Sequence, residues 1–272
     1  MPATQHHALT HNPNHLDLQL VASYPRRIEA SLTRVWENVL DWEHLPHLHD
    51  SAFSYSELDE AGLWGWRVWS SPDRSGYFEL VVDTNCYVVR SYTGGEQFSE
   101  IWTHLSAQQE ATDIRVEFYS AGVDDDNRDG IGEMYLALYK VLWDEDEAMM
   151  QQRQLRLDNP RADVPQVNLG DASALRQNGP HRFELNRREY LLGEQGGSWL
   201  ATPTICPHLL GPLEAAAEPG QLRCPWHGYV FDIETGKCLT PADARCTLAR
   251  PPILVEEGGE LIARSHSENE PS

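Results

Sequence analysis

The chain is poor in basic residues. Its 272 residues include 21 Lys and Arg against 42 Asp and Glu, which gives a formal net charge of −21. A surface of that sign repels phosphate backbones and anionic lipid, which argues against nucleic acid or a membrane as a partner. The same charge favours a basic patch on a partner protein, although solubility alone also accounts for it.

Long apolar runs are absent too, and no segment approaches the length that spans a bilayer. Residues 1–16 are polar, lack periodicity and contain no apolar signal core, so we expect a disordered N-terminus and a cytoplasmic protein. No G-x-G-x-x-G fingerprint of a dinucleotide-binding domain is present.

Cysteine is scarce, but two of the five cysteines lie in a paired motif. Cys206 and His208 stand in C-P-H-L-L-G, and Cys224 and His227 stand in C-P-W-H-G-Y. Two thiolates for one iron and two imidazoles for the other are the ligands of a Rieske [2Fe–2S] cluster. These loops resemble the Rieske family, and the resemblance implies an electron-transfer centre at these four residues.

A structural zinc site of the Cys2His2 type is the alternative, because it takes the same ligand types. Zinc fingers usually pair like ligands, as C-x2-4-C and H-x3-5-H, whereas each loop here mixes one Cys with one His. Gly211 and Gly228 follow the ligand turns, where we expect residues that tolerate positive φ.

The other cysteines, Cys86, Cys238 and Cys246, are expected to be reduced core residues without a disulfide. Rieske proteins of respiratory complexes carry an extra Cys in each ligand loop. Here Gly211 or Pro212 and Trp226 stand at those places, so the loops look like the oxygenase and ferredoxin branch.

The first part of the chain predicts a helix, an antiparallel sheet and a second, longer helix. A strand is expected near Leu18–Ser23, and Ser31 is a plausible N-cap. Short aromatic and β-branched runs separated by turn signals fill residues 52–120. The first helix would bury Leu32, Val35, Trp36, Val39 and Leu40. The long helix, from about Ile131 to Leu157, would bury Met134, Leu138, Val141, Leu142 and Met149.

The order of these elements resembles the helix-grip arrangement of START-like (SRPBCC) and ring-hydroxylase catalytic domains. We therefore expect an α+β fold: a helix-grip catalytic domain over 17–158, a linker at 159–163, an all-β Rieske domain over 164–264 and a loose tail from 265 to 272. Within the second domain, a strand is expected over Arg182–Leu192.

A second site follows the first helix, where Glu37, Asp41, His44 and His49 form the pattern E-x3-D-x2-H-x4-H. Rieske non-haem iron oxygenases carry this pattern at their mononuclear iron. By that resemblance, His44 and His49 are imidazole ligands, and Asp41 bridges the two metal centres. His47 is an alternative to His49, or a residue that orients a ligand.

The third iron ligand must come from elsewhere, because ferrous ions that activate O₂ use two His and one carboxylate on one face. In the family it is an Asp on the last helix of the catalytic domain. Asp146 matches; a carboxylate on an apolar helix face is costly unless it is paired or binds metal. Glu145 is the nearest alternative.

The resemblance implies an oxidoreductase of the aromatic ring-hydroxylating alpha-subunit type, with the domain order reversed and a shortened catalytic domain. It would hold a [2Fe–2S] cluster and mononuclear Fe(II). With O₂ it would hydroxylate, dihydroxylate or demethylate a small apolar substrate, walled by some of Trp64, Trp66, Trp69, Phe78 and Trp102.

The same resemblance implies partners. Electrons would come from a separate NAD(P)H-dependent reductase or a ferredoxin, and the protein would be a homo-oligomer, a trimer, in which His227 contacts Asp41 at the subunit boundary. Two alternatives remain open: an electron carrier whose first domain binds ligands without catalytic iron, and a redox-sensing binding module.

Overall fold

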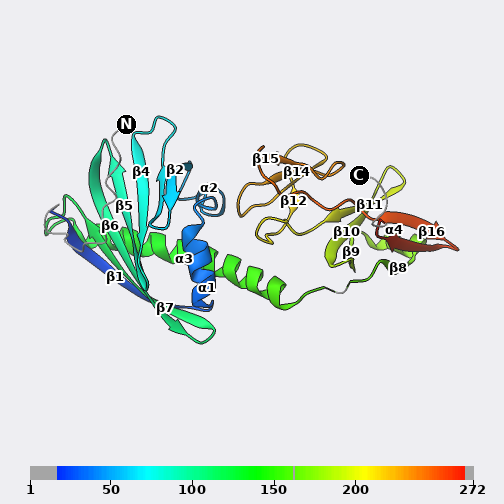
Figure 1. The fold of residues 1–272 in the computed structure, drawn as a ribbon, viewed down its shortest axis with the longest axis horizontal. Helices are drawn as coiled ribbons and strands as arrows, with labels where there is room; N and C mark the ends of the chain where they lie inside the picture. The colour runs from blue at the N-terminus through cyan, green and yellow to red at the C-terminus, as the bar shows by residue number, and fades with distance from the viewer. Residues whose placement is uncertain (1–16, 162, 267–272) are drawn as a thin grey trace. The chain divides into compact units, whose positions relative to one another are not determined.

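The computed structural model describes residues 17–161 and 163–266. The segment 1–16 and nearly all of the tail from 265 to 272, both predicted to be loose, lie outside these residues. The chain divides into two compact units, Met1–Gln151 and Gln152–Ser272. The division falls inside the long helix α3 (Arg128–Asp158), before the boundary that we expected at its end (Figure 1).

The first unit contains one seven-stranded antiparallel sheet with the order β1-β7-β6-β5-β4-β3-β2. Each strand from β2 to β7 pairs with the next, and β1 closes the series by pairing with β7. The sheet predicted within 52–120 is thereby confirmed. Its strands are β1 (Gln19–Ile28), β2 (Glu57–Gly62), β3 (Gly65–Trp69), β4 (Gly76–Val82), β5 (Cys86–Thr93), β6 (Glu96–Gln108) and β7 (Ala111–Ser120).

Strand β1 is longer than the predicted Leu18–Ser23. The prediction stopped before Pro25, which lacks the N–H that a central strand needs. Because β1 lies at the edge of the sheet and pairs with β7 alone, it accommodates the proline and runs on to Ile28.

Helix α1 (Leu32–Leu40) begins as predicted, with the Ser31 hydroxyl accepting a hydrogen bond from the Arg34 amide at 3.4 Å. Val35 and Val39 are buried, but Leu40 is 47% exposed, contrary to the predicted face. Asn38 takes the third buried place on the helix. A polar residue is stable there because its amide has a partner in Asp146.

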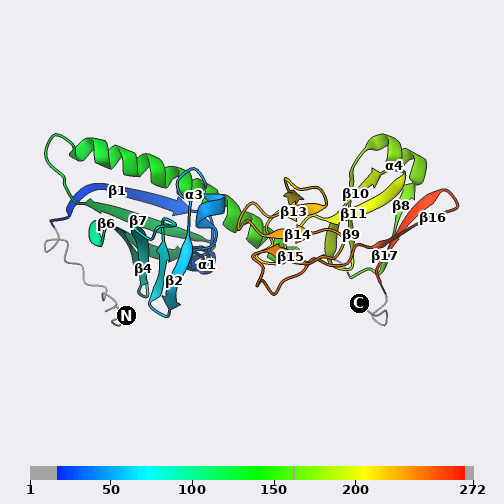
Figure 2. The same ribbon diagram turned by 90° about the horizontal axis from the view of Figure 1, so that it is seen from above.

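Helix α3 lies along one face of the sheet (Figure 2). The predicted helix is confirmed, but the predicted buried face is partly wrong, since Met134 is 58% and Val141 45% exposed. Tyr135, Tyr139 and Trp143, spaced four residues apart, pack against the core instead. Aromatic side chains bury more apolar area than the Met and Val that the periodicity favoured.

Phe118 on β7 is the centre of this packing. It is fully buried, and its ring centroid lies 5.1 Å from that of Tyr135 and 4.7 Å from that of Tyr139. Gly132 lets the helix approach β1 closely, because a Cβ at this position would lie 2.7 Å from the Val21 carbonyl oxygen. The helix is thereby packed closely against the sheet near its N-terminal end.

The second unit is rich in strands, as predicted, and its strands form three small sheets. One contains β9 (His181–Leu185), β10 (Arg188–Gln195) and β11 (Ser198–Pro203); the next contains β12 (Glu214–Ala215), β13 (Gln221–Arg223), β14 (Val230–Asp232) and β15 (Cys238–Thr240); the third contains β16 (Ile253–Glu257), β17 (Glu260–Arg264) and β8 (Gln166–Asp171). Helix α4 (Ala172–Asn178) follows β8.

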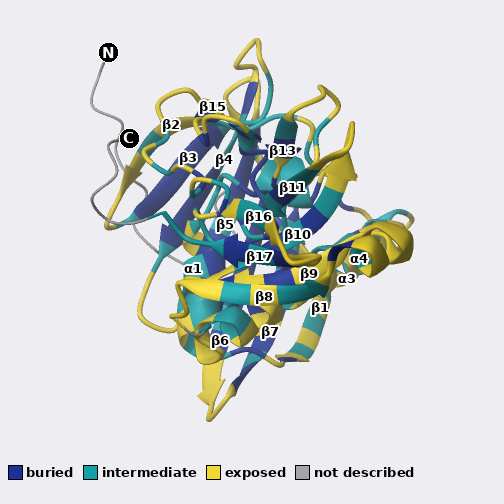
Figure 3. Cartoon of the chain, turned by 90° about the vertical axis from the view of Figure 1, so that its right-hand side faces the viewer, coloured by how far each residue is buried: buried dark blue, intermediate teal, exposed yellow. Residues whose placement is uncertain are grey.

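The single strand predicted over Arg182–Leu192 is instead a hairpin, turned at Asn186 and Arg187 with φ of 47° and 63°. Asn readily adopts this conformation, and we overlooked that signal. The core of the unit lies between the first and third sheets around Leu185, Leu192 and Leu261. Buried and exposed stretches alternate along the strands in Figure 3.

Candidate metal centres

The two histidines of the first-unit motif flank a short helix. His44 precedes α2 (Leu45–Leu48) and His49 follows it, with a proline in the first turn. The amide of Leu48 donates to the His44 carbonyl oxygen at 2.8 Å, which holds the turn closed. Both side chains are buried, and their ring centroids lie 5.0 Å apart. The short helix therefore turns both rings toward one point.

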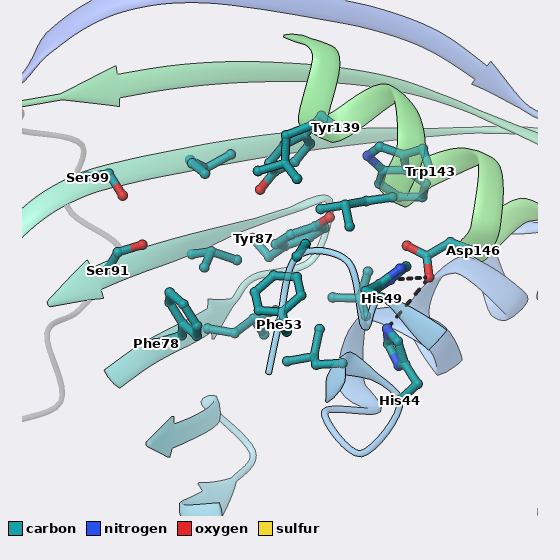
Figure 4. Close-up of a pocket in the computed structure, with 18 of the residues that line it drawn as sticks. His44, His49, Phe53, Phe78, Tyr87, Ser91, Ser99, Tyr139, Trp143 and Asp146 are labelled. Atoms are coloured by element: carbon teal, nitrogen blue, oxygen red, sulfur yellow. Dashed lines mark ion pairs between the residues drawn. The ribbon is translucent and has the colours of Figure 1, made fainter. Parts of the chain in front are cut away.

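Asp146 reaches that point from α3. Its Oδ1 lies 3.0 Å from His49 Nε2 and 3.6 Å from His44 Nε2 (Figure 4). The same oxygen accepts a hydrogen bond from Asn38 Nδ2 at 2.9 Å. One ligand atom from each of His44, His49 and Asp146 lies within 4.8 Å of the others. The structure thus brings together, across 102 positions of sequence, three donors that could hold one metal ion.

The electrostatics of the group favour a charged carboxylate. Burial alone would raise the pKa of Asp146, but the hydrogen bond from His49, the charges of both histidines and the bond from Asn38 outweigh it and lower that pKa. Burial alone would lower the pKa of His49, yet Asp146 and Glu145 together raise it. A cation at this point would likewise favour the charged form of the Asp146 carboxylate.

Glu145, the alternative ligand, lies on the far side of His49. Its Oε2 is 2.6 Å from His49 Nδ1, while His49 Nε2 faces Asp146. The two ring nitrogens of His49 therefore face two different carboxylates. His47 is half-buried and outside the group, and Asp41 Oδ2 lies 3.7 Å from His44 Nδ1.

A cavity of about 390 Å³ opens beside this group, between the sheet and α3. Trp66 and Phe78 line it, as the sequence suggested, but Trp64, Trp69 and Trp102 do not. Trp102, together with Trp64, packs around Val81 and Val88 instead, in a cluster separate from the main core. The aromatic residues that the sequence analysis missed are Phe53, Tyr87, Phe98, Tyr135, Tyr139 and Trp143.

In the second unit, Cys206 and Cys224 lie in two loops of the same construction. The Cys206 amide donates to the Gly211 carbonyl oxygen, and the Cys224 amide donates to that of Tyr229, each at 2.8 Å. Each loop is thus closed five residues after its cysteine. Both thiols are 1% exposed.

The two sulfurs lie close enough to share a proton. Their hydrogen bond raises the pKa of Cys206 and lowers that of Cys224, the acceptor in that bond. Cluster iron binds thiolates, so a site that already favours one thiolate suits it.

The two imidazoles of these loops also meet. The ring centroids of His208 and His227 lie 4.7 Å apart, and Tyr229 stacks on His208 at 4.4 Å. His227 is buried and His208 half-buried. The cysteine pair and the histidine pair are what the two irons of a Rieske cluster require.

The loop glycines act in two different ways. Gly228 has a φ of 67°, as predicted, but the positive φ of the first loop falls on Leu210, at 63°. Gly211 is needed for space, because a Cβ there would lie 2.7 Å from the Cys224 sulfur and 2.9 Å from the Trp226 ring. The first loop therefore packs directly on the second.

Arg156, in the last turn of α3, contacts both loops. Its guanidinium donates to the Leu210 carbonyl oxygen and lies 5.8 Å from the centroid of the Trp226 ring. Burial lowers the pKa of Arg156, although the pKa starts so high that the group keeps its charge. A fixed cation thus joins the loops that carry the four predicted cluster ligands.

Residues 166–252 match the family model described as the Rieske [2Fe-2S] domain, and this segment contains Cys206, His208, Cys224 and His227. The second unit therefore contains a Rieske domain. Apoptosis-inducing factor 3 of Mus musculus and of Homo sapiens are each 40% identical over 62 residues, or 22% of this chain. The match spans 10% of the length of each of these curated relatives.

Solved structures similar to parts of the chain include three proteins. The ferredoxin of carbazole 1,9a-dioxygenase from Nocardioides aromaticivorans IC177 is 23% identical, with a TM-score of 0.29 over 38% of this chain and 100% of its own. The Pseudomonas putida CBB5 NdmA QL mutant with caffeine is 14% identical, with a TM-score of 0.40; the match covers 55% of this chain and 45% of that one. Norcoclaurine synthase from Thalictrum flavum is 16% identical, with a TM-score of 0.37; the match covers 56% of this chain and 97% of that one.

None of the helices among the described residues is both long and apolar enough to cross a membrane.

Proposed function

We propose that this chain is a Rieske-type oxygenase, in which a [2Fe–2S] cluster supplies electrons to a mononuclear non-haem iron. The observation that carries the proposal is the convergence of His44, His49 and Asp146 at one end of an apolar cavity, in a chain that also contains a Rieske domain. A Rieske domain alone suits an electron carrier; an apolar cavity ending at three metal-binding side chains suits chemistry on a bound organic molecule.

The donor sets fit both groups. Cys206 and Cys224 would hold one iron of the cluster, and His208 and His227 the other. His44, His49 and Asp146 would hold the mononuclear iron, a set that leaves positions open for dioxygen. When bound, this iron supplies the activation of O₂, which the side chains themselves cannot perform.

The protein's own residues then have distinct tasks. Asn38 holds the Asp146 carboxylate by a hydrogen bond, and Glu145 fixes the tautomer and direction of the His49 ring. The cavity walls exclude water and position the substrate against the metal end. Asp41, near His44, remains our candidate for the residue that bridges the two metal centres between neighbouring subunits.

Several parts of the proposal come from the family resemblance. They are the helix-grip class of the first unit, a homotrimer, and an external reductase or ferredoxin as electron donor. They also include the reaction type, which is hydroxylation, dihydroxylation or oxidative demethylation. The domain order, with the sheet unit first, reverses the usual one.

Oxygen uptake tests the proposal. Protein loaded with iron and coupled to a competent NAD(P)H-dependent reductase is mixed with aromatic, terpenoid and N-methyl compounds. We expect at least one compound class to stimulate O₂ consumption and to yield an oxygenated or demethylated product. Uptake that no compound stimulates, from protein with about two iron atoms per chain, would favour an electron carrier instead.

A further inference from the structure

The cavity has a polar feature at the end opposite to the metal-binding group. Ser99 is 1% exposed, and among the described residues its Oγ has no hydrogen-bond partner. A buried hydroxyl without a partner forfeits the hydrogen bonds it made with water in the unfolded chain. Such a group, facing a cavity, is placed to bind something that enters it.

Ser99 does not stand alone. Ser91 on β5 is its direct partner in the register with β6, and both serines line the cavity. Figure 4 shows the pair at one end and His44, His49 and Asp146 at the other. Phe53 and Tyr87 lie between the two ends in the same view. The cavity is therefore polar at its two ends and aromatic in between.

The charges in the cavity wall are confined to the metal end. Among the lining residues, the acidic and imidazole groups are Asp41, His44, His49 and Asp146, and no Lys or Arg lines the wall. Burial raises the pKa of Tyr87 and of Tyr139, so both phenols stay neutral. A charged ligand group at the serine end would be buried without a counter-ion, which is costly.

We infer that the cavity binds an elongated, uncharged aromatic molecule with one carbonyl group, a ketone or an amide, and that Ser99 Oγ donates a hydrogen bond to this carbonyl at the end remote from His44 and His49. That such a molecule is the substrate rests on the proposed oxygenase function. The binding preference rests on the cavity alone. The aromatic body lies along Phe53 and Tyr87, and its carbonyl-free end points to the metal-binding group.

Equilibrium dialysis of the intact, oxidised protein tests this inference without turnover. The probes are 4-acetylbiphenyl and 4-ethylbiphenyl, which share one biphenyl body and differ only in the carbonyl at one end. We expect the protein to bind 4-acetylbiphenyl about fivefold more tightly, the effect of one neutral hydrogen bond. Ser99→Ala should remove this preference and leave the affinity for 4-ethylbiphenyl within about twofold of the wild-type value.

Ser106→Ala is the matched control, because Ser106 lies on the same strand, β6, and is exposed outside the cavity lining. It should change neither affinity. Unchanged binding of 4-ethylbiphenyl by Ser99→Ala also shows that the variant has folded. A preference for 4-acetylbiphenyl that survives Ser99→Ala, or no preference in the wild type, would overturn the inference.

The two proposals fail separately. If the carbonyl preference depends on Ser99 but no compound stimulates O₂ uptake, the oxygenase assignment falls while the ligand class stands. If O₂ uptake is stimulated but Ser99→Ala keeps the preference, the ligand class falls and the oxygenase assignment stands.

Discussion

Asp146 is a buried carboxylate on an otherwise apolar helix face, and its neighbours show how such a residue is kept charged. It accepts hydrogen bonds from Asn38 and His49 and lies near His44. Without these partners its burial would cost several kcal/mol or force protonation. The three partners come from α1 and from the two ends of α2, so the fold and the candidate site stabilise each other.

Glu145 provides a test at the residue scale. Glu145→Gln should weaken iron binding at the mononuclear site about 10–100-fold, because the amide holds the His49 imidazole less firmly and makes it less basic. Iron content after dialysis against graded chelator measures this, while the visible absorption of the cluster should not change.

The neighbouring Asp144 offers the control. Its side chain is 56% exposed and pairs with Arg26, away from the histidines. Asp144→Asn should leave iron retention at the wild-type value. Equal losses of iron in both variants would contradict the orienting role of Glu145.

Sequence reasoning worked best where chemistry restricts residue types. The spacing of Cys206, His208, Cys224 and His227 was enough to predict a Rieske domain, and the family match supports it. The apolar helix face already favoured Asp146 over Glu145 in the sequence, and the structure buries Asp146 beside His44 and His49 while Glu145 contacts the other nitrogen of His49. Ser99 carried no signal at all, since its role depends on what the sheet encloses.

At the scale of elements, the helix α3 is fixed against the sheet by a small residue rather than by a large one. A Cβ at Gly132 would meet the Val21 carbonyl oxygen at 2.7 Å, whereas one at Gly130, half a turn away on the same helix, would meet nothing within 4 Å. A substitution at Gly130 therefore tests helix propensity alone, whereas one at Gly132 also tests the packing of the helix against β1.

We predict opposite effects of alanine at these two positions. Gly130→Ala should stabilise the protein by about 0.5–1 kcal/mol through helix propensity, whereas Gly132→Ala should destabilise it by about 1–3 kcal/mol through overpacking against β1. Urea unfolding followed by circular dichroism measures both. Stabilisation by Gly132→Ala would show that the helix is not held at this contact.

Arg156 supports a second prediction at this scale. A fixed cation beside the cluster loops stabilises the reduced cluster, which carries one more negative charge. Arg156→Leu should therefore lower the reduction potential of the cluster. We expect a tenfold change in the one-electron equilibrium, which corresponds to about 59 mV.

Arg156→Lys keeps the charge and serves as the control in the same redox titration, followed by visible absorption. Its potential should stay near the wild-type value. An equal fall in both variants would indicate that the contacts with Leu210 and Trp226, rather than the charge, set the potential.

The elements themselves were largely predictable, but their faces were not. Apolar periodicity placed α1 and α3, yet it put Leu40, Met134 and Val141 inside, where Asn38 and a row of aromatic residues lie instead. A hydrophobicity pattern cannot foresee that a polar residue is buried because a partner 108 positions away satisfies it.

At the scale of the whole molecule, one chain carries two candidate metal centres. The sheet unit offers a cavity with three metal-binding side chains, and the second unit contains the Rieske domain. The change in pattern after residue 158 predicts two domains, and the chain divides into two compact units at Gln151. The cavity could not be predicted from the sequence, because its walls come from residues spread between Asn38 and Asp146 that only the folded sheet brings together.

A single-turnover experiment tests the central claim, that electrons from the cluster are used at the His44, His49 and Asp146 site. Iron-loaded protein is reduced without oxygen, freed of reductant, given a compound that stimulates O₂ uptake, and mixed with O₂. We predict that the wild type forms product as its cluster absorption recovers. Asp146→Ala, with about two iron atoms per chain instead of about three, should form none. Product formed by Asp146→Ala in wild-type yield would contradict the account.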